Sequence, residues 1–211
     1  APTHGKRACT GVHKPWPPCH MRVSPASSSI ATASSMPQPL AGLNELAPTT
    51  DVFILDLWGV VHGGVQPFPG VVETLEAIRA AGKKVAFVSN APVRSHHVAG
   101  QLDRMGLGRA YDRLLTSGEA TWQHLNSAHP RRRYYGIGPS WARLLHEDLA
   151  EGPVGRIEEA DLLLVVGMEE ARPLPEHYLG ELEAARARGL PFVCANPDRV
   201  IVVQDGTYSW C

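Results

Sequence analysis

The stretch Asp51–Gly64, DVFILDLWGVVHGG, contains the strongest structural signal in the sequence. Its apolar run Val52–Leu55 predicts a strand that is buried on both faces, as in parallel α/β sheets. The run ends at Asp56, and a carboxylate at the end of a buried strand is costly unless it is paired or functional. Open α/β sheets place their ligands at this end of their strands, and Gly59 indicates a tight turn or a close approach to a ligand. We therefore interpret Asp56 as a nucleophile or metal ligand, and the alternative is an aspartate that caps the loop.

A second strand pattern follows at Lys84–Val88 and ends in Ser89–Asn90. Between the two strands, apolar residues recur at helical spacing from Val72 to Ile78, and Gly82 marks the end of that helix. This order of elements predicts a β-α-β unit with a right-handed crossover. The fold class is therefore α/β. Further along the chain, we expect Ser117 to cap the helix that follows it, and Val200–Val203 and Thr207–Trp210 to form a hairpin.

Four segments in this order resemble the haloacid dehalogenase (HAD) superfamily. They are DLWGVVHGGVQPFPGV from Asp56, VSNAP from Val88, TSGEA from Thr116 and CANPD from Cys194. The residues of these segments are most similar to the motifs of the NagD-like class IIA hydrolases, and within that class to a subgroup with Trp in motif I. The resemblance implies a Rossmann-like parallel sheet, here partial, with an inserted α/β cap domain of the C2 type.

The domain organisation follows from composition and from this resemblance. Residues 1–44 contain no acidic residue and no sustained apolar period, which predicts a disordered leader. Such a leader suits an organelle transit peptide or translated upstream sequence before Met36, and we prefer the second interpretation. Residues 45–133 would form the HAD core with motifs I and II, and residues 134–211 the cap. Motifs III and IV follow the cap in the family and are not found here, so we interpret the chain as C-terminally truncated.

The resemblance also assigns roles to individual residues. Asp56 matches the motif I nucleophile, which forms an aspartyl-phosphate. Ser89 matches the motif II hydroxyl that binds the phosphoryl group, and Asn90 the neighbouring residue that positions substrate. Trp58 and Gly59 lie in the loop expected to bind phosphate. Mg²⁺ would take the Asp56 carboxylate and the main-chain carbonyl of Trp58.

Two departures from the family pattern affect the predicted chemistry. Phosphatases of this superfamily carry a second Asp as general acid–base two residues after the first, where this chain has Trp58. Haloacid dehalogenases also lack it, because a halide leaving group needs no proton. His62 would supply a proton if the loop folds it inward, but we prefer a surface or packing histidine. No lysine follows Lys84, so the motif III counter-ion is missing, as are the acidic motif IV ligands of the metal.

Composition narrows the partners and the compartment. A net charge of −1, with 44% hydrophobic and 19% charged residues, indicates a globular protein without general attraction to nucleic acid or acidic membranes. No apolar run approaches the ~20 residues of a membrane helix. Four scattered cysteines suggest no disulfide framework, which favours a cytoplasmic location. The basic cluster Arg131–Arg133 predicts a surface loop, with a phosphate or polyanion site as the alternative.

The resemblance implies a Mg²⁺-dependent class IIA HAD hydrolase of the phosphatase type, and the composition is compatible with it. Its partner would be a small phosphorylated metabolite, bound at Asp56, and a homo-oligomer is compatible with the sequence. Trp58 leaves open a dehalogenase-like hydrolase, and together with the missing lysine it leaves open a non-catalytic phosphate-ligand-binding protein. Because catalytic groups are missing, we expect the 211-residue chain itself to be inactive. Cap loops carry no readable code, so the substrate is not predicted.

Overall fold

The computed structural model describes residues 39–146, 149, 152–169, 171–198, 200–202 and 208–210. The predicted leader therefore lies almost entirely outside the described residues. Ordered structure begins with two short 3-10 helices, η1 (Leu43–Glu45) and η2 (Ala47–Thr49). Leu43 already packs against the first core, just ahead of the predicted boundary at residue 45. Within this described part of the chain, no helix has the length and apolarity to cross a membrane.

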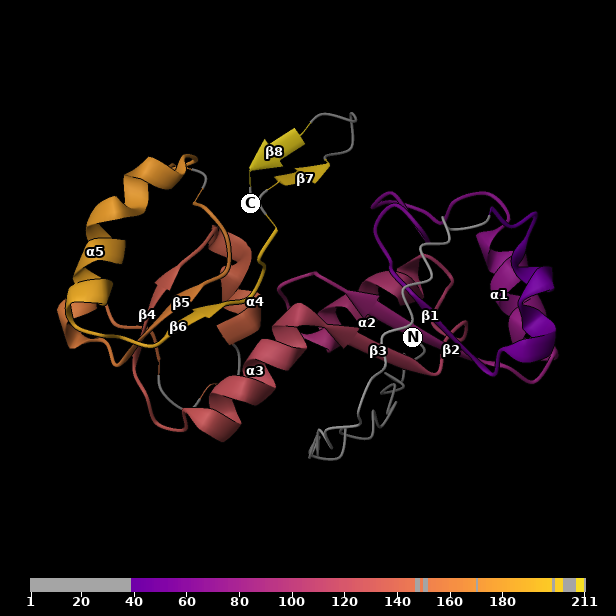
Figure 1. Cartoon of the computed structure of the whole chain (residues 1–211), viewed down its shortest axis with the longest axis horizontal. Coiled ribbons are helices and arrows are strands. Elements are labelled where there is room, and N and C mark those ends of the chain that lie inside the picture. Colours follow the sequence, from indigo (N-terminus) through magenta and orange to yellow (C-terminus); the bar gives the residue numbers. More distant parts are fainter. Residues whose placement is uncertain are drawn as a thin grey trace, which may run out of the picture. The chain divides into compact units, whose positions relative to one another are not determined.

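The first sheet has three parallel strands in the order in which they occur in the chain (Figure 1). They are β1 (Val52–Leu55), β2 (Lys84–Ser89) and β3 (Arg113–Thr116). Helix α1 (Val71–Ala80) connects β1 to β2, and α2 (Ser95–Arg104) connects β2 to β3. Leu55 lies opposite Phe87, and Ser89 lies opposite Thr116. The predicted β-α-β unit is confirmed.

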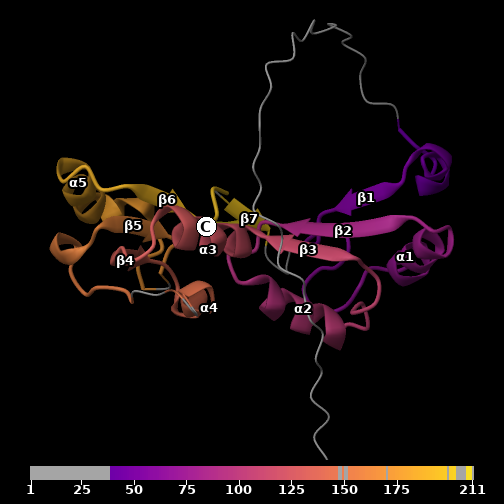
Figure 2. The ribbon, with the colours of Figure 1, turned by 90° about the horizontal axis from the view of Figure 1, so that it is seen from below.

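One face of this sheet is buried and the other is open. Both α1 and α2 lie on the same face, as Figure 2 shows. Phe53 and Phe87 point to that face and are 5% and 0% exposed. Val52 and Ile54 point to the opposite face and are 51% and 68% exposed. The prediction that the β1 run is buried on both faces is therefore wrong, because both crossover helices cover a single face.

The second sheet is also three-stranded and parallel, again in chain order. It comprises β4 (Tyr134–Ile137), β5 (Leu162–Val165) and β6 (Phe192–Cys194). Its helices are α3 (Ser117–Ala128), α4 (Arg143–His146) and α5 (Leu179–Ala187), with short 3-10 turns at η3 (Ser140–Ala142), η4 (Ile157–Glu159) and η5 (Pro175–Tyr178). The predicted C-terminal hairpin is present as β7 (Val200–Val202) paired antiparallel with β8 (Tyr208–Trp210).

Both faces of the second sheet are covered. Leu162 and Leu164 of β5 belong to a cluster that includes Leu125 of α3, whereas Leu163 belongs to a cluster that includes Tyr178. All three leucines of β5 are at most 1% exposed. Since Leu125 takes part, the second core includes the end of α3, which lies before the predicted boundary at residue 134.

Candidate active site

Asp56 lies at the carboxyl edge of the first sheet, directly after β1. Because β1 and β2 are parallel neighbours, Ser89 at the end of β2 lies at the same edge. Asp56 is exposed, and the main-chain N–H of Leu57 donates to its Oδ1 at 2.7 Å. Its Oδ2 makes no hydrogen bond to the described residues. One carboxylate oxygen is thus held in place and the other is available for chemistry.

The loop after Asp56 folds back on itself around two buried side chains. Leu57 and Val61 are 2% and 1% exposed, and the Leu57 carbonyl accepts from the N–H groups of Val61 and His62 at 2.9 and 3.1 Å. Gly59 has a φ of 78°, the left-handed region that favours glycine, so the predicted tight turn is confirmed. The Gly59 N–H donates to the His62 carbonyl at 2.9 Å. In this conformation that N–H is already used within the loop.

Trp58 and His62 pack against each other at the base of the loop. Their rings meet edge to face with centroids 6.0 Å apart, and Trp58 is 45% exposed whereas His62 is 4% exposed. The Gly64 N–H donates to His62 Nδ1 at 3.0 Å. Burial lowers the pKa of His62 below its usual value, although the charge of Asp56 raises it. His62 is therefore a neutral packing residue near pH 7, with its proton on Nε2.

Ser89 and Asn90 continue this edge at the end of β2, and both are half-buried. Ser89 Oγ accepts from the Ala91 N–H at 3.3 Å. The Asn90 side-chain amide donates to Asn196 Oδ1 at 2.6 Å and to Asp198 Oδ2 at 2.5 Å. Asn196 and Asp198 follow β6 and were not among the predicted site residues. They carry a signal similar to that of Asp56, namely polar residues shortly after the end of a parallel strand.

Helix α3 begins beside Asn90. Thr116 caps it, because its Oγ1 accepts from the Glu119 N–H at 3.0 Å while donating to the Val93 carbonyl at 2.6 Å. Ser117, which the sequence pattern predicts as the cap, is instead the first helical residue. That prediction is wrong because Thr116 has the extended backbone that the N-cap position requires. The Ser117 hydroxyl donates to the Asn90 carbonyl at 3.0 Å.

A partly buried ion pair fastens the start of α3 to the start of α2. Arg94 Nε donates to Glu119 Oε2 at 2.8 Å, and its guanidinium lies 3.7 Å from the centre of the Trp122 ring. Burial by itself raises the pKa of Glu119, but hydrogen bonds from Arg94 and a main-chain N–H outweigh it and leave that pKa below its usual value. A Cβ at Gly118 would lie 2.4 Å from the Val93 nitrogen, so only glycine fits there.

The oxygen donors near Asp56 are of the kind that Mg²⁺ prefers. The Asp56 carboxylate and the Trp58 carbonyl are hard ligands, and Mg²⁺ in proteins usually completes its shell with waters and substrate phosphate. Among the described residues there is no group of three or more His, Cys, Asp or Glu that could hold a metal ion. The Asp56 carboxylate and the Trp58 carbonyl would therefore fit an ion that is also bound by a substrate phosphate.

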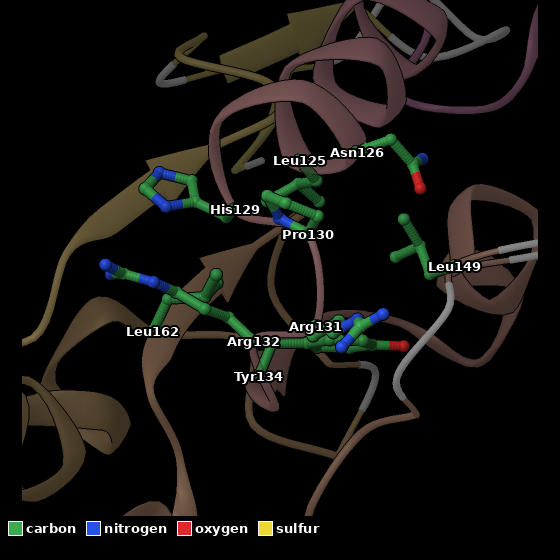
Figure 3. A pocket seen from close by; sticks show the side chains of 9 residues that line it. All are labelled: Leu125, Asn126, His129, Pro130, Arg131, Arg132, Tyr134, Leu149 and Leu162. Carbon is green, nitrogen blue, oxygen red and sulfur yellow. The ribbon is translucent and has the colours of Figure 1, made fainter.

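The arginine cluster lies elsewhere, beside the second core. Arg131 and Arg132 line a cavity of about 20 Å³ with His129, Tyr134 and Leu162, and the two arginine side chains extend to different sides of it (Figure 3). Such a volume holds about one water molecule. All three arginines are exposed, and Arg133 pairs with Asp161 at 3.3 Å. The surface-loop interpretation is confirmed, and this cavity is too small for a phosphate ester.

The amino-acid sequence is similar to sequences of known hydrolases. The profile of the haloacid dehalogenase-like hydrolase family matches residues 53–150, which include every predicted site residue. The chain is 30% identical over 122 residues to the chloroplastic phosphoglycolate phosphatase 1A of Arabidopsis thaliana. That match covers 56% of this chain and 34% of the relative, so the chain spans about a third of that protein.

Solved structures agree in fold. A haloacid dehalogenase-like hydrolase from Brucella suis superposes with a TM-score of 0.70 at 32% identity, over 80% of this chain and 62% of that one. A glycerol phosphate phosphatase from Mycobacterium tuberculosis, solved in complex with magnesium, superposes with a TM-score of 0.59 at 26% identity, over 78% and 49%. Residues 53–150 of this chain therefore match the haloacid dehalogenase-like hydrolase family, and the solved structures are similar to the described residues in fold, in agreement with the predicted NagD-like class IIA.

Proposed function

We propose that this chain carries the nucleophile and phosphate-binding part of a Mg²⁺-dependent phosphatase of small phosphorylated metabolites. The position of Asp56 carries the proposal. It is an exposed carboxylate at the carboxyl edge of a parallel sheet, with one oxygen held by Leu57 and the other uncommitted, beside Ser89. Relatives named as phosphoglycolate and glycerol phosphate phosphatases support the same chemistry.

The expected reaction begins with Asp56 Oδ2. This oxygen attacks phosphorus, the ester P–O bond breaks, and the leaving alkoxide takes a proton from solvent water as an aspartyl-phosphate forms. A second water then attacks the phosphorus of that intermediate, which releases phosphate and regenerates the Asp56 carboxylate. The Leu57 N–H orients the attacking carboxylate. Ser89 accepts from Ala91, which leaves its hydroxyl hydrogen for a phosphoryl oxygen. A bound Mg²⁺ would supply charge neutralisation at the phosphoryl group.

Trp58 favours a second candidate function. An indole cannot protonate a leaving alcohol, and neutral His62 is a poor acid because its pKa is lowered by burial. A halide needs no proton, so a dehalogenase-like hydrolase tolerates Trp58, and a non-catalytic phosphate binder needs no acid at all. Phosphate esters with a good leaving group, such as p-nitrophenyl phosphate, tolerate it as well.

A mimic of the aspartyl-phosphate tests the proposed nucleophile without requiring turnover. Beryllium fluoride with Mg²⁺ should give a bound ¹⁹F NMR signal with the native chain and none with Asp56→Asn. Asp51→Asn is the matched control, because Asp51 also flanks β1 but lies at its other end and is exposed. A bound signal that survives in Asp56→Asn, or none in the native chain, would contradict the proposal.

Turnover by the 211-residue chain should be undetectable. The lysine expected to stabilise the phosphoryl charge is missing, and losing one such preorganised group lowers the rate by a factor of roughly 10²–10³. The general acid–base is replaced by Trp58, and its loss lowers the rate by a factor of roughly 10²–10⁴. We therefore expect native chain and Asp56→Asn to release nitrophenol from p-nitrophenyl phosphate at the same background rate. Release that depends on Asp56 would show that the groups present suffice. Chloride release from a halo-acid would favour the dehalogenase instead.

A further inference from the structure

The contacts of Asn90 determine which way its side-chain amide points. The Asp198 N–H donates to Asn196 Oδ1 at 3.0 Å, so that Asn196 atom is an oxygen acceptor. The second neighbour, Asp198 Oδ2, is a carboxylate oxygen. Because the terminal Asn90 atom lies 2.6 and 2.5 Å from these two acceptors, it must be the NH₂ group.

Both amide hydrogens of Asn90 are consumed by this arrangement. An NH₂ group has two hydrogens, and each goes to one of the two acceptors. The polar atom of the side chain that remains is the carbonyl oxygen, which can only accept. Next to Ser89, such an oxygen repels a phosphoryl oxygen and attracts a donor, for instance a hydroxyl group of a substrate. The amide of Asn90 is thus unable to donate to a phosphoryl group while Asn196 and Asp198 hold it.

The main chain at this position is held equally firmly. The Ser117 hydroxyl donates to the Asn90 carbonyl at 3.0 Å, and the Gly118 N–H donates to the Ala91 carbonyl at 3.2 Å. Two separate segments therefore contact residues 90–91: the start of α3, which leads to the second sheet, and the residues that follow β6. A displacement of either segment would therefore shift the end of β2, because hydrogen bonds connect both segments to residues 90–91.

We propose that Asn196 and Asp198 are positioning residues of the candidate site, which hold Asn90 so that its carbonyl oxygen accepts from a substrate hydroxyl. This inference rests on the proposed function. It selects hydroxylated phosphate esters, such as polyol phosphates, over phosphate esters that end in a carboxylate. A carboxylate is itself only an acceptor near pH 7, and it gains nothing from the Asn90 oxygen.

The hold on the amide is measured first, independently of any ligand. The Asn90 side-chain ¹H–¹⁵N pair is identified by its loss in Asn90→Ser, and its hydrogen exchange with solvent is recorded. Asp198→Ala should accelerate that exchange about tenfold, since a charged acceptor is lost. Asp198→Asn retains an oxygen acceptor and should restore slow exchange. Unchanged exchange in Asp198→Ala would overturn the assignment. The control is Glu183→Ala, which removes an exposed acid of α5 that is distant in sequence from Asn90.

A second variant covers a failure of Asp198→Ala to fold. Asn196→Ala removes the other acceptor and should also accelerate exchange, whereas Asn196→Asp keeps an oxygen and should not. If Asp198→Ala does not fold, an unchanged exchange rate in Asn196→Ala overturns the assignment instead.

Ligand preference is measured next, by calorimetry in the presence of Mg²⁺. Glycerol 3-phosphate should bind the native chain about fivefold tighter than phosphoglycolate, roughly the effect of one hydrogen bond. Asp198→Ala should lose that preference and Asp198→Asn should keep it, with the affinity of each protein for inorganic phosphate measured as the reference. Equal or reversed preference in the native chain would overturn the substrate part. If not even inorganic phosphate binds, the proposed function itself fails, and the exchange experiment alone decides the positioning role.

Discussion

The two sheets of this protein share strand number, strand direction and strand order, but they differ in burial. The central strand β5 of the second sheet is buried on both faces, with Leu162, Leu163 and Leu164 at most 1% exposed. In the first sheet one core lies on one face, and Ile54 on the other face is 68% exposed. The difference arises from the helices, because α1 and α2 share a face whereas α5 lies opposite α3 and α4 (Figure 2).

This comparison shows that a parallel strand of apolar residues does not imply burial on both faces. An apolar side chain stabilises the sheet only where a helix removes it from water. The predictions that follow test the contrast between the two sheets and the helix α3 that joins them, in order of decreasing effect.

Leu163→Ala should destabilise the protein strongly, by about 2–5 kcal/mol, because truncating a fully buried leucine leaves a cavity. Leu163 of β5 is 0% exposed and belongs to the same cluster as Ala185 of α5. Urea denaturation followed by circular dichroism measures the change in the free energy of unfolding. Leu182→Ala on the exposed side of α5 is the matched control, since Leu182 is 37% exposed. A loss below about 1 kcal/mol for Leu163→Ala would mean that this face of the sheet is open as well.

Gly118→Ala should cost about 1–3 kcal/mol through overpacking at the junction of the first sheet and α3. The added methyl would lie 2.4–2.5 Å from three backbone atoms of Val93, which cannot move aside as a side chain can. Gly180→Ala, where the new Cβ meets no atom within 4 Å, is the control and should be neutral or slightly stabilising. Equal stability of the two variants would show that the junction is loose.

Glu119 probes the same junction through pH. Its pKa is lowered in the folded protein, so its contribution to stability is present above the usual carboxylate range, near 4.5, and is lost as the pH falls through the folded value. The native protein should therefore lose more unfolding free energy between pH 6 and pH 3, as an approximate range, than Glu119→Gln loses. Glu183→Gln, an exposed residue of α5, should follow the native protein. Identical pH profiles for the native protein and Glu119→Gln would show that the ion pair between Arg94 and Glu119 does not contribute to stability.

Ile54→Ala should have the smallest effect, within about 0.5 kcal/mol, because the side chain is already mostly in water. Phe53→Ala, one residue earlier and 5% exposed, is the matched comparison and should cost about 3–5 kcal/mol. The same denaturation measurement applies to both. A large loss for Ile54→Ala would indicate that its face of the sheet is covered in solution.

Much of the fold could be predicted from short-range signals. The strands at β1, β2 and β5 are apolar runs, and glycines such as Gly82 and Gly106 end helices, so positions along the chain are readable. The burial of each face was not readable, because VFIL at β1 and LLLV at β5 look alike. Which face a crossover helix covers depends on packing between segments that are distant in sequence.

For the candidate site, the positions of its residues at the sheet edge could be predicted, but not all of their contacts. Asp56, Ser89 and Asn90 lie at one sheet edge as parallel strands require. The partners of Asn90 were missed because they lie more than 100 residues further along the chain, at a separation of 106 and 108 residues. The cap of α3 was misplaced by one residue, since both Thr116 and Ser117 are good caps and only backbone conformation separates them.

The chain order of the strands has a consequence for synthesis. Every strand in both parallel sheets pairs with the strand that precedes or follows it in its own sheet, so each sheet is made from one continuous stretch of chain. Domains fold from the N-terminus as they leave the ribosome. The three described strands of the first sheet have therefore all been translated before the first strand of the second sheet. During that interval its open apolar face, with Val52 and Ile54, is the surface a chaperone would meet.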